Sequence, residues 1–142
     1  VAIAAAGGIE VLVSLARDGN EAQKDCAAGA LWCLADNDDN KAAIVAAGGI
    51  EVLIALARDG NGAQKERAAG TLWNLSDNDE NSVAIAAAGG IEVLMSLARD
   101  GSEGQKENAA CALGNMIEVA PATHEGVVEA GGVAVLSSLT HE

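Results

Sequence analysis

The side chains that could carry acid–base or metal chemistry are few in this chain. His124 and His141 are its two histidines, and neither has a partner at the spacing of a metal site or a catalytic triad. Of the three cysteines, only Cys111 is a candidate for reactivity, and a small buried apolar role explains it more simply. No pair of acids stands apart as an acid–base couple. We therefore predict a protein that is not an enzyme and that needs no metal or cofactor.

Two further motifs resemble ion sites. Residues 36–40 read D-N-D-D-N, the opening of a calcium loop, but they lack the glycine and the distant glutamate that complete one. A related stretch begins at Asp77, and helix capping explains both stretches better. The Gly-Gly pairs lack the G-x-x-x-x-G-K-[ST] pattern of a phosphate loop. We interpret these motifs as turns between helices.

An internal repeat determines the architecture. The string GGIEVL begins at Gly7, Gly48 and Gly89, and GGVAVL follows at Gly131, so the steps are 41, 41 and 42 residues. Self-similarity at this period is typical of a helical solenoid, in which each unit packs on its neighbours. We predict one all-α domain over residues 1–142, with units at about 1–37, 38–78, 79–119 and a partial fourth at 120–142.

Each unit is predicted to contain three helices. In unit two the first runs from about 38 to 47 and starts with acidic and Asn residues, which cap it and complement its dipole. Gly48 and Gly49 then turn the chain. A second helix at about 50–58 has an apolar stripe and ends at Gly60, where we expect a left-handed cap. A third at about 62–76 has its own core stripe. The stripes consist of Ile50, Leu53, Leu56 and Ala57, and of Ala68, Leu72 and Leu75.

These features resemble the armadillo repeat family. The resemblance rests on AIVAAGGIEVLIALARDGN followed by AQKERAAGTLWNLSDN, with its short, medium and long helices, and it extends over essentially the whole chain. It implies a right-handed α-α superhelix whose third helices line a concave face. In this family an Asn late in the third helix binds the backbone of an extended peptide, and the matching column here is Cys33, Asn74 and Asn115. An amide both donates and accepts hydrogen bonds, so such a ladder suits a peptide backbone. The alternative is that Asn74 and Asn115 only satisfy nearby helix termini.

Three other sets of residues flank this column. Trp32 and Trp73 immediately precede it and are candidates to hold the side chains of a ligand, although packing between units is the interpretation we favour. Two acidic rows suit Lys or Arg side chains of a ligand, or else are solvated charges. The rows are Asp25, Glu66 and Glu107, and Asp36, Asp77 and Glu118.

Charge and composition restrict the partners. Eight basic and 21 acidic residues give a net charge of −13, which argues against nucleic acid and against anionic membranes. No apolar run reaches the length of a membrane span, and no signal peptide is visible. Cys26 and Cys33 lie too far apart along one helix for a disulfide, so free thiols indicate an intracellular protein, cytoplasmic or nuclear.

The sequence therefore predicts a scaffold that binds an extended peptide of a partner protein along the third helices, and the acidic rows favour a basic peptide. The alternative is a structural spacer or self-assembling module. Neither end carries a polar capping unit, so we expect a piece of a longer array whose exposed ends associate.

Overall fold

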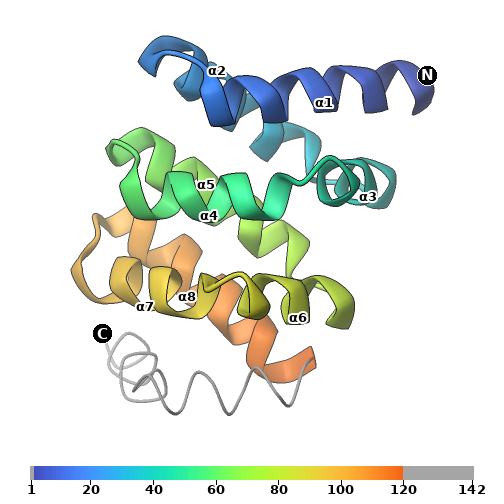
Figure 1. Cartoon of the computed structure of the whole chain (residues 1–142). Coiled ribbons are helices and arrows are strands. Elements are labelled where there is room, and N and C mark those ends of the chain that lie inside the picture. The colour runs from blue at the N-terminus through green and yellow to red at the C-terminus, as the bar shows by residue number, and fades with distance from the viewer. Residues whose placement is uncertain (1, 120–142) are drawn as a thin grey trace.

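The computed structural model describes residues 2–119, and these form eight helices without a strand. In chain order the helices are α1 (Ala2–Asp18), α2 (Glu21–Leu34), α3 (Asp38–Ala46), α4 (Gly49–Asp59), α5 (Gly62–Leu75), α6 (Asp79–Ala87), α7 (Gly90–Asp100) and α8 (Glu103–Val119). Units two and three each contain the predicted short, medium and long helix, at almost the predicted bounds. Figure 1 shows the units stacked on one another, which confirms an all-α solenoid. The predicted fourth unit, with Pro121, His124 and His141, lies outside the described residues.

Local sequence signals explain how each helix begins. Asn37 and Asn78 cap α3 and α6 through their side-chain oxygens. Asn20 and Asn61 form capping boxes with Gln23 and Gln64, in which each side chain bonds the other residue's backbone N–H. The polar residues at the turns therefore define the helix boundaries.

Glycines make the turn between the first and second helices. Gly48 and Gly89 have φ values of 80° and 86°, a left-handed conformation that side chains disfavour. The following Gly49 lies so close to Ile44 that an added Cβ would meet its backbone oxygen at 2.6 Å. As a result α3 and α4 meet at 83°, and α6 and α7 at 86°.

The prediction of a left-handed Gly60 is wrong, because its φ is −75° and its ψ is 177°. Its glycine is explained by close approach instead. A Cβ there would lie 2.6 Å from the Leu56 carbonyl oxygen and 2.7 Å from Oε1 of Gln64. The capping side chain of α5 therefore occupies the space that a larger residue would need.

Unit one departs from the repeat, because α1 continues through Gly7 and Gly8 instead of turning there. In units two and three an Asn cap opens a separate first helix, and a left-handed glycine ends it. A Cβ at Gly7 or Gly8 would meet nothing within 4 Å, so no packing against these glycines enforces a turn. Helical hydrogen bonds therefore continue from the first helix into the second.

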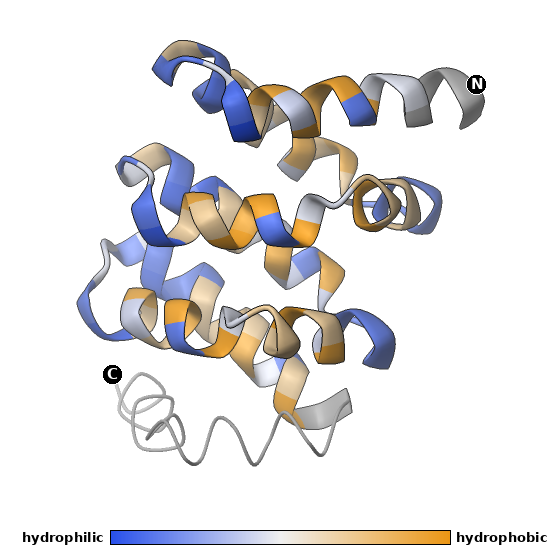
Figure 2. Ribbon diagram, in the orientation of Figure 1, coloured by the Kyte–Doolittle hydropathy of each residue, from blue (hydrophilic) through white to orange (hydrophobic). Residues whose placement is uncertain are grey.

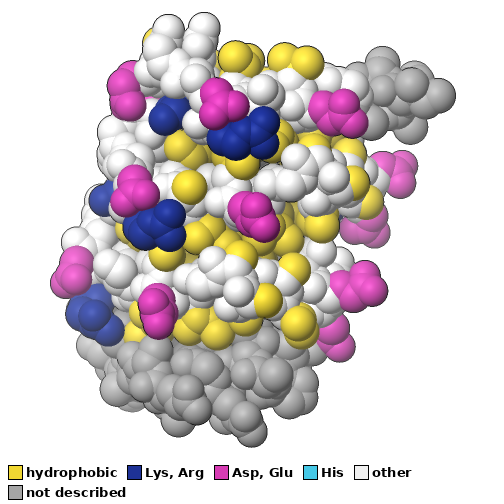
Figure 3. All heavy atoms as spheres, in the orientation of Figure 1, with side chains coloured by type: hydrophobic (Ala, Val, Ile, Leu, Met, Phe, Trp, Pro, Cys, Tyr) yellow, Lys and Arg dark blue, Asp and Glu magenta, His cyan; other side chains and the backbone are white. Residues whose placement is uncertain are grey.

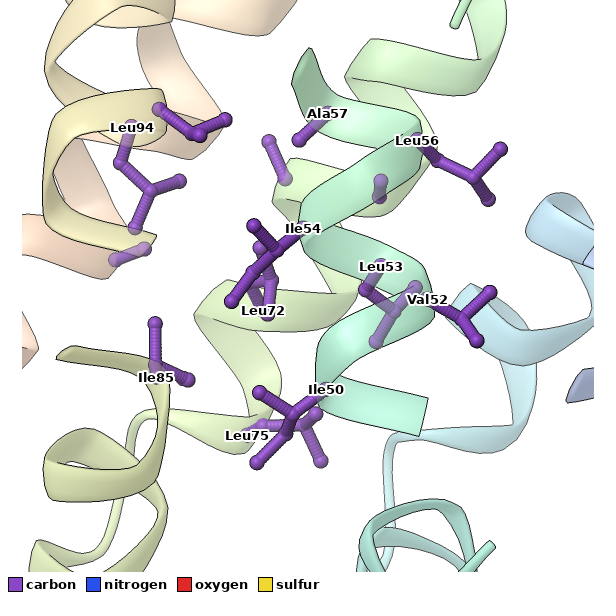
Figure 4. Packing of buried hydrophobic residues seen from close by; sticks show 14 of the residues in the cluster. Ile50, Val52, Leu53, Ile54, Leu56, Ala57, Leu72, Leu75, Ile85 and Leu94 are labelled. Carbon is purple, nitrogen blue, oxygen red and sulfur yellow. The ribbon is translucent and has the colours of Figure 1, made fainter. Parts of the chain in front are cut away.

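The core is formed between units as well as within them. In Figure 4, Val52 and Leu56 of α4 point to one side, Ile50 and Ile54 point to the other, towards α6 and α7, and Leu53 lies over α5. All of these side chains are buried. The predicted stripe on this helix was therefore too narrow, because a neighbouring unit covers each flank. Figure 2 shows the same pattern, with hydrophobic segments inside the stack and hydrophilic ones at the turns.

No single described helix is long and apolar enough to cross a membrane. Two bent pairs, α3 with α4 and α6 with α7, meet the length and composition criteria only when taken together. The apolar residues of α4 and α7 are buried in the core between units.

Candidate functional site

The third helices α2, α5 and α8 lie side by side and form two seams. We call the contact of α2 with α5 the first seam, and that of α5 with α8 the second seam. At the second seam Nδ2 of Asn115 lies 3.5 Å from the backbone oxygen of Trp73 and 3.3 Å from Oγ of Ser76. Trp73 immediately precedes Asn74, so the two asparagines occupy matching positions on neighbouring helices. The second seam therefore aligns these two members of the predicted column.

The members of this column differ in their surroundings. Asn115 uses its amide N–H groups within the chain, as the helix-terminus alternative requires. Asn74 is half-buried on α5, and its side chain forms no hydrogen bond with another described residue. Cys33, on α2, is exposed. Asn74 is therefore the member whose amide is available to an outside group.

The tryptophans pack against protein. The indole of Trp32 lies across Gly70 of the next unit, where an added Cβ would be 2.5 Å from its Cε2 atom. Trp73 is partly buried and packs against the hydrophobic core. These contacts agree with packing between units, and a role of either ring in holding a ligand stays a prediction.

The carboxylate of Asp25 is engaged within the first seam. It accepts hydrogen bonds from Nδ2 of Asn61 at 3.0 Å and from Nε2 of Gln64 at 2.7 Å. These two hydrogen bonds, and more weakly the Arg67 guanidinium, lower the pKa of Asp25, while burial acts in the opposite direction. Asp25 therefore holds units one and two together, a role that the sequence analysis did not assign to it.

The other two members of this acidic row lie further along the stack. Glu66 is half-buried, and a Cβ at Gly104 on α8 would collide with its carboxylate. Glu107 is exposed. Burial raises the pKa of the nearby Cys111 thiol, and the charge of Glu107 raises it further, so this thiol is not activated as a nucleophile.

The second acidic row lies at the ends of the third helices. Asp36 is exposed in the turn between α2 and α3. Asp77 follows α5, and its carboxylate pairs with the ammonium of Lys41 on α3. The side chain of Glu118 is not among those that the structure describes. The side chain of Asp77 therefore contacts a first helix, α3, in addition to lying at the end of a third helix.

Sequence reasoning missed the residues that join the units through backbone carbonyls. Nη1 of Arg67 donates to the carbonyl of Asp25 at 2.9 Å, and at the matching position Nδ2 of Asn108 donates to that of Glu66 at 3.0 Å. Gln105 donates to the carbonyl of Gly62 at 2.9 Å. The available signal was the capping pattern, N-x-x-Q before Gln64 and S-x-x-Q before Gln105, since each of these glutamines also reaches the preceding unit. Within residues 2–119 no cluster of three His, Cys, Asp or Glu side chains could hold a metal ion.

Comparison with known proteins agrees with this geometry. The model of the Armadillo/beta-catenin-like repeat matches residues 37–77 and 78–117, and the chain therefore belongs to this family. No curated protein matches the sequence. Among solved structures, an engineered protein is 37% identical with a TM-score of 0.88, and the match covers 94% of this chain and 55% of that one.

Two designed armadillo repeat proteins are also similar. One, described as designed for modular peptide recognition, is 25% identical with a TM-score of 0.89, covering 96% of this chain and 58% of that one. The other, solved in complex with the peptide (KR)4, is 24% identical with a TM-score of 0.88 and the same coverage. The chain thus spans less than two thirds of the length of each of these structures. Armadillo repeats commonly mediate protein–peptide binding and are generally non-enzymatic.

Proposed function

We propose that this chain is a non-enzymatic scaffold that binds an extended basic peptide of a partner protein across α5 and α8. The single observation that carries the proposal is Asn74, whose half-buried amide forms no hydrogen bond with another described residue. Such an amide can donate to a peptide carbonyl and accept from a peptide N–H. The designed relative solved with (KR)4 supports the choice of a basic peptide by analogy of fold.

Charge supports the same choice. The chain carries a net charge of −13, and Glu107 is exposed on α8, about two helical turns before Asn115. Asp25 and Asp77 are already paired within the chain, so we assign the electrostatic contribution mainly to Glu66 and Glu107. Their carboxylates attract Lys and Arg side chains and increase the association rate more than the affinity. The three free cysteines support an intracellular location, which we also propose.

The test is the affinity for the peptide (KR)4 by titration calorimetry, with Asn74→Ala as the variant. We expect the Kd to rise roughly fivefold, because a lost amide hydrogen bond is worth about 1 kcal/mol. Asn40→Ala is the matched control, since Asn40 is a half-buried asparagine on the first helix α3. Unchanged affinity in Asn74→Ala would refute the assignment to this face.

A second pair of variants tests the charge. Glu107→Gln and Glu92→Gln change the net charge equally, but Glu92 is exposed on the second helix α7. Only Glu107→Gln should weaken (KR)4 binding, roughly two- to fivefold, as expected for an exposed ion pair. Equal weakening in both variants would mean non-specific attraction. No (KR)4 binding, together with assembly of the unliganded chain in sedimentation, would favour the alternative of a self-assembling spacer.

A further inference from the structure

A groove of about 500 Å³ lies between the first helices α3 and α6, and Asn74 is not among the residues that line it. Its apolar lining consists of Val45 and two alanines of α3. Three acidic residues, Asp38, Asp77 and Glu80, also line it. Figure 3 shows acidic side chains along the edge of the molecule where α3 and α6 lie in Figure 1. The groove thus combines an apolar surface with negative charge.

Asn81 lies in the wall of this groove and has an unusual environment. The residue is only 8% exposed, and its backbone N–H donates to the capping side chain of Asn78. Its own side-chain amide forms no hydrogen bond with any other described residue. Gln64 and Gln105 are buried to a similar degree, yet both have several partners. A buried amide without a partner has lost its hydration and gained nothing in return, so Asn81 points to a group that is supplied from outside.

The ionic groups of the groove leave an excess of negative charge. The ammonium of Lys41 lies between Asp77 and Asp38, 3.8 Å from an oxygen of Asp38. Asp38 and Asp77 therefore share one cation, and Glu80 forms no ion pair within the described residues. In unit three the position of Lys41 is taken by Ser82, whose hydroxyl donates to the carbonyl of Ser76. This arrangement therefore belongs to the boundary between units two and three.

We propose that this groove binds one arginine or lysine residue of an extended segment of a partner protein. The aliphatic stem of that residue covers Val45, its cation lies between Glu80 and Asp38, and its backbone amide pairs with Asn81. An anionic ligand would face three carboxylates, and a purely apolar ligand would leave Asn81 unpaired. The site is formed by the first helices, so it does not depend on the proposed role of the third-helix face.

The test uses the full chain labelled with ¹⁵N and the blocked pentapeptide acetyl-Gly-Gly-Arg-Gly-Gly-amide. We expect saturable shifts of the Asn81 side-chain NH₂ signals. Replacing arginine with citrulline, its neutral isostere, should weaken the titration at least threefold. An absence of shifts at Asn81, or equal binding of the citrulline peptide, would overturn the proposal. A water molecule alone on Asn81 would give this same negative result.

Variants separate this site from its surroundings. Glu80→Gln should weaken the arginine peptide roughly two- to fivefold, the range of an exposed ion pair. Asp79→Asn is the matched control, because Asp79 is exposed in the same helical turn but does not line the groove. Equal weakening in both variants would overturn the proposal. Asn74→Ala should leave the Asn81 shifts unchanged, whereas their loss in that variant would assign the peptide to the third-helix face. Wild-type titrations decide the matter even if one variant fails to fold.

Discussion

The first and second seams have the same helix register but are held together by different chemistry. At the first seam the side chains of Asn61 and Gln64 donate to the carboxylates of Glu21 and Asp25. At the second seam Gln105 donates to a backbone carbonyl, because Gly62 replaces Glu21 and offers no side chain. The inter-unit hydrogen bonds of the first seam therefore involve ionised carboxylates, whereas those of the second seam involve neutral backbone carbonyls.

The seams also differ in how they fill the space between helices. At the first seam the Trp32 ring lies against Gly70, which has no Cβ. The position of Gly70 is taken by Cys111 in the next unit, so the second seam accommodates a side chain there. The repeat thus determines which positions are in contact between units. The residues at those positions determine whether the contact is ionic, polar or steric.

The largest effect that we expect comes from filling the space beside Trp32. In Gly70→Ala the new Cβ would lie 2.5 Å from the ring, so the indole must move. Overpacking of this kind costs about 1–3 kcal/mol of the free energy of unfolding, measured by urea titration. Gly114→Ala on α8 is the control, because a Cβ there meets nothing within 4 Å and should stabilise the helix by up to about 1 kcal/mol.

A companion variant identifies the cause. Trp32→Ala should abolish most of the penalty of Gly70→Ala, since the colliding ring is gone. If Gly70→Ala proves as stable as the parent protein, the close approach of α2 and α5 does not exist in solution.

A smaller effect is expected from acid at the first seam. The pKa of Asp25 is below its ordinary value of 3.8, because Asn61 and Gln64 donate to the charged form. The charged seam therefore contributes its full stability above that value and loses it as pH falls through the lower, folded-state pKa. We expect the melting temperature of the wild type to fall more steeply below about pH 4 than that of Asp25→Asn.

The matching substitution at the second seam provides the comparison. Glu66→Gln should leave the steepness of this acid transition nearly unchanged, because the inter-unit hydrogen bonds there run to backbone carbonyls. An acid transition that Asp25→Asn does not alter would show that the first seam owes nothing to the charge of Asp25.

The repeat allowed the fold of units two and three to be predicted closely. The period, the Asn caps and the Gly-Gly turns predicted α5 at about 62–76, and it ends at Leu75. These signals are local, so one sequence contains them. In unit one the predicted turn at Gly7 was wrong, because α1 continues through this residue.

The site was less predictable, because its chemistry depends on pairs of residues about 40 positions apart. The repeat period was enough to predict that Asn74 and Asn115 share a column. The hydrogen bond from Asn115 to the Trp73 carbonyl could not be predicted in this way, because it depends on the distance between two helices. Asp25 is a similar case. Within its own unit it looks like a free charge, but in the structure Gln64 of the next unit donates a hydrogen bond to it. Gly60 shows the same limit of sequence analysis. A glycine was expected at that turn for its left-handed conformation, whereas the structure explains it by the close approach of Gln64.

The smallest effect should come from the ion pair between Lys41 and Asp77, which joins the turn after α5 to α3. The Lys41 side chain is 12% exposed, but that of Asp77 is 48% exposed, so water screens the pair. We expect Lys41→Ser, which introduces the residue found in unit three, to cost at most about 1 kcal/mol in urea unfolding. Salt at about 1 M, where the Debye length is about 3 Å, should reduce that difference.

A double-mutant cycle with Asp77→Asn separates the ion pair from the packing of the lysine stem. The coupling energy should be below about 1 kcal/mol. The rest of the loss should persist in Lys41→Ser at high salt, because the Lys41 side chain is only 12% exposed and the packing of its methylenes is lost as well. A larger coupling that salt does not change would mean that the pair is shielded from water. The boundary between the first helices would then resemble the ionic first seam more than the neutral second seam.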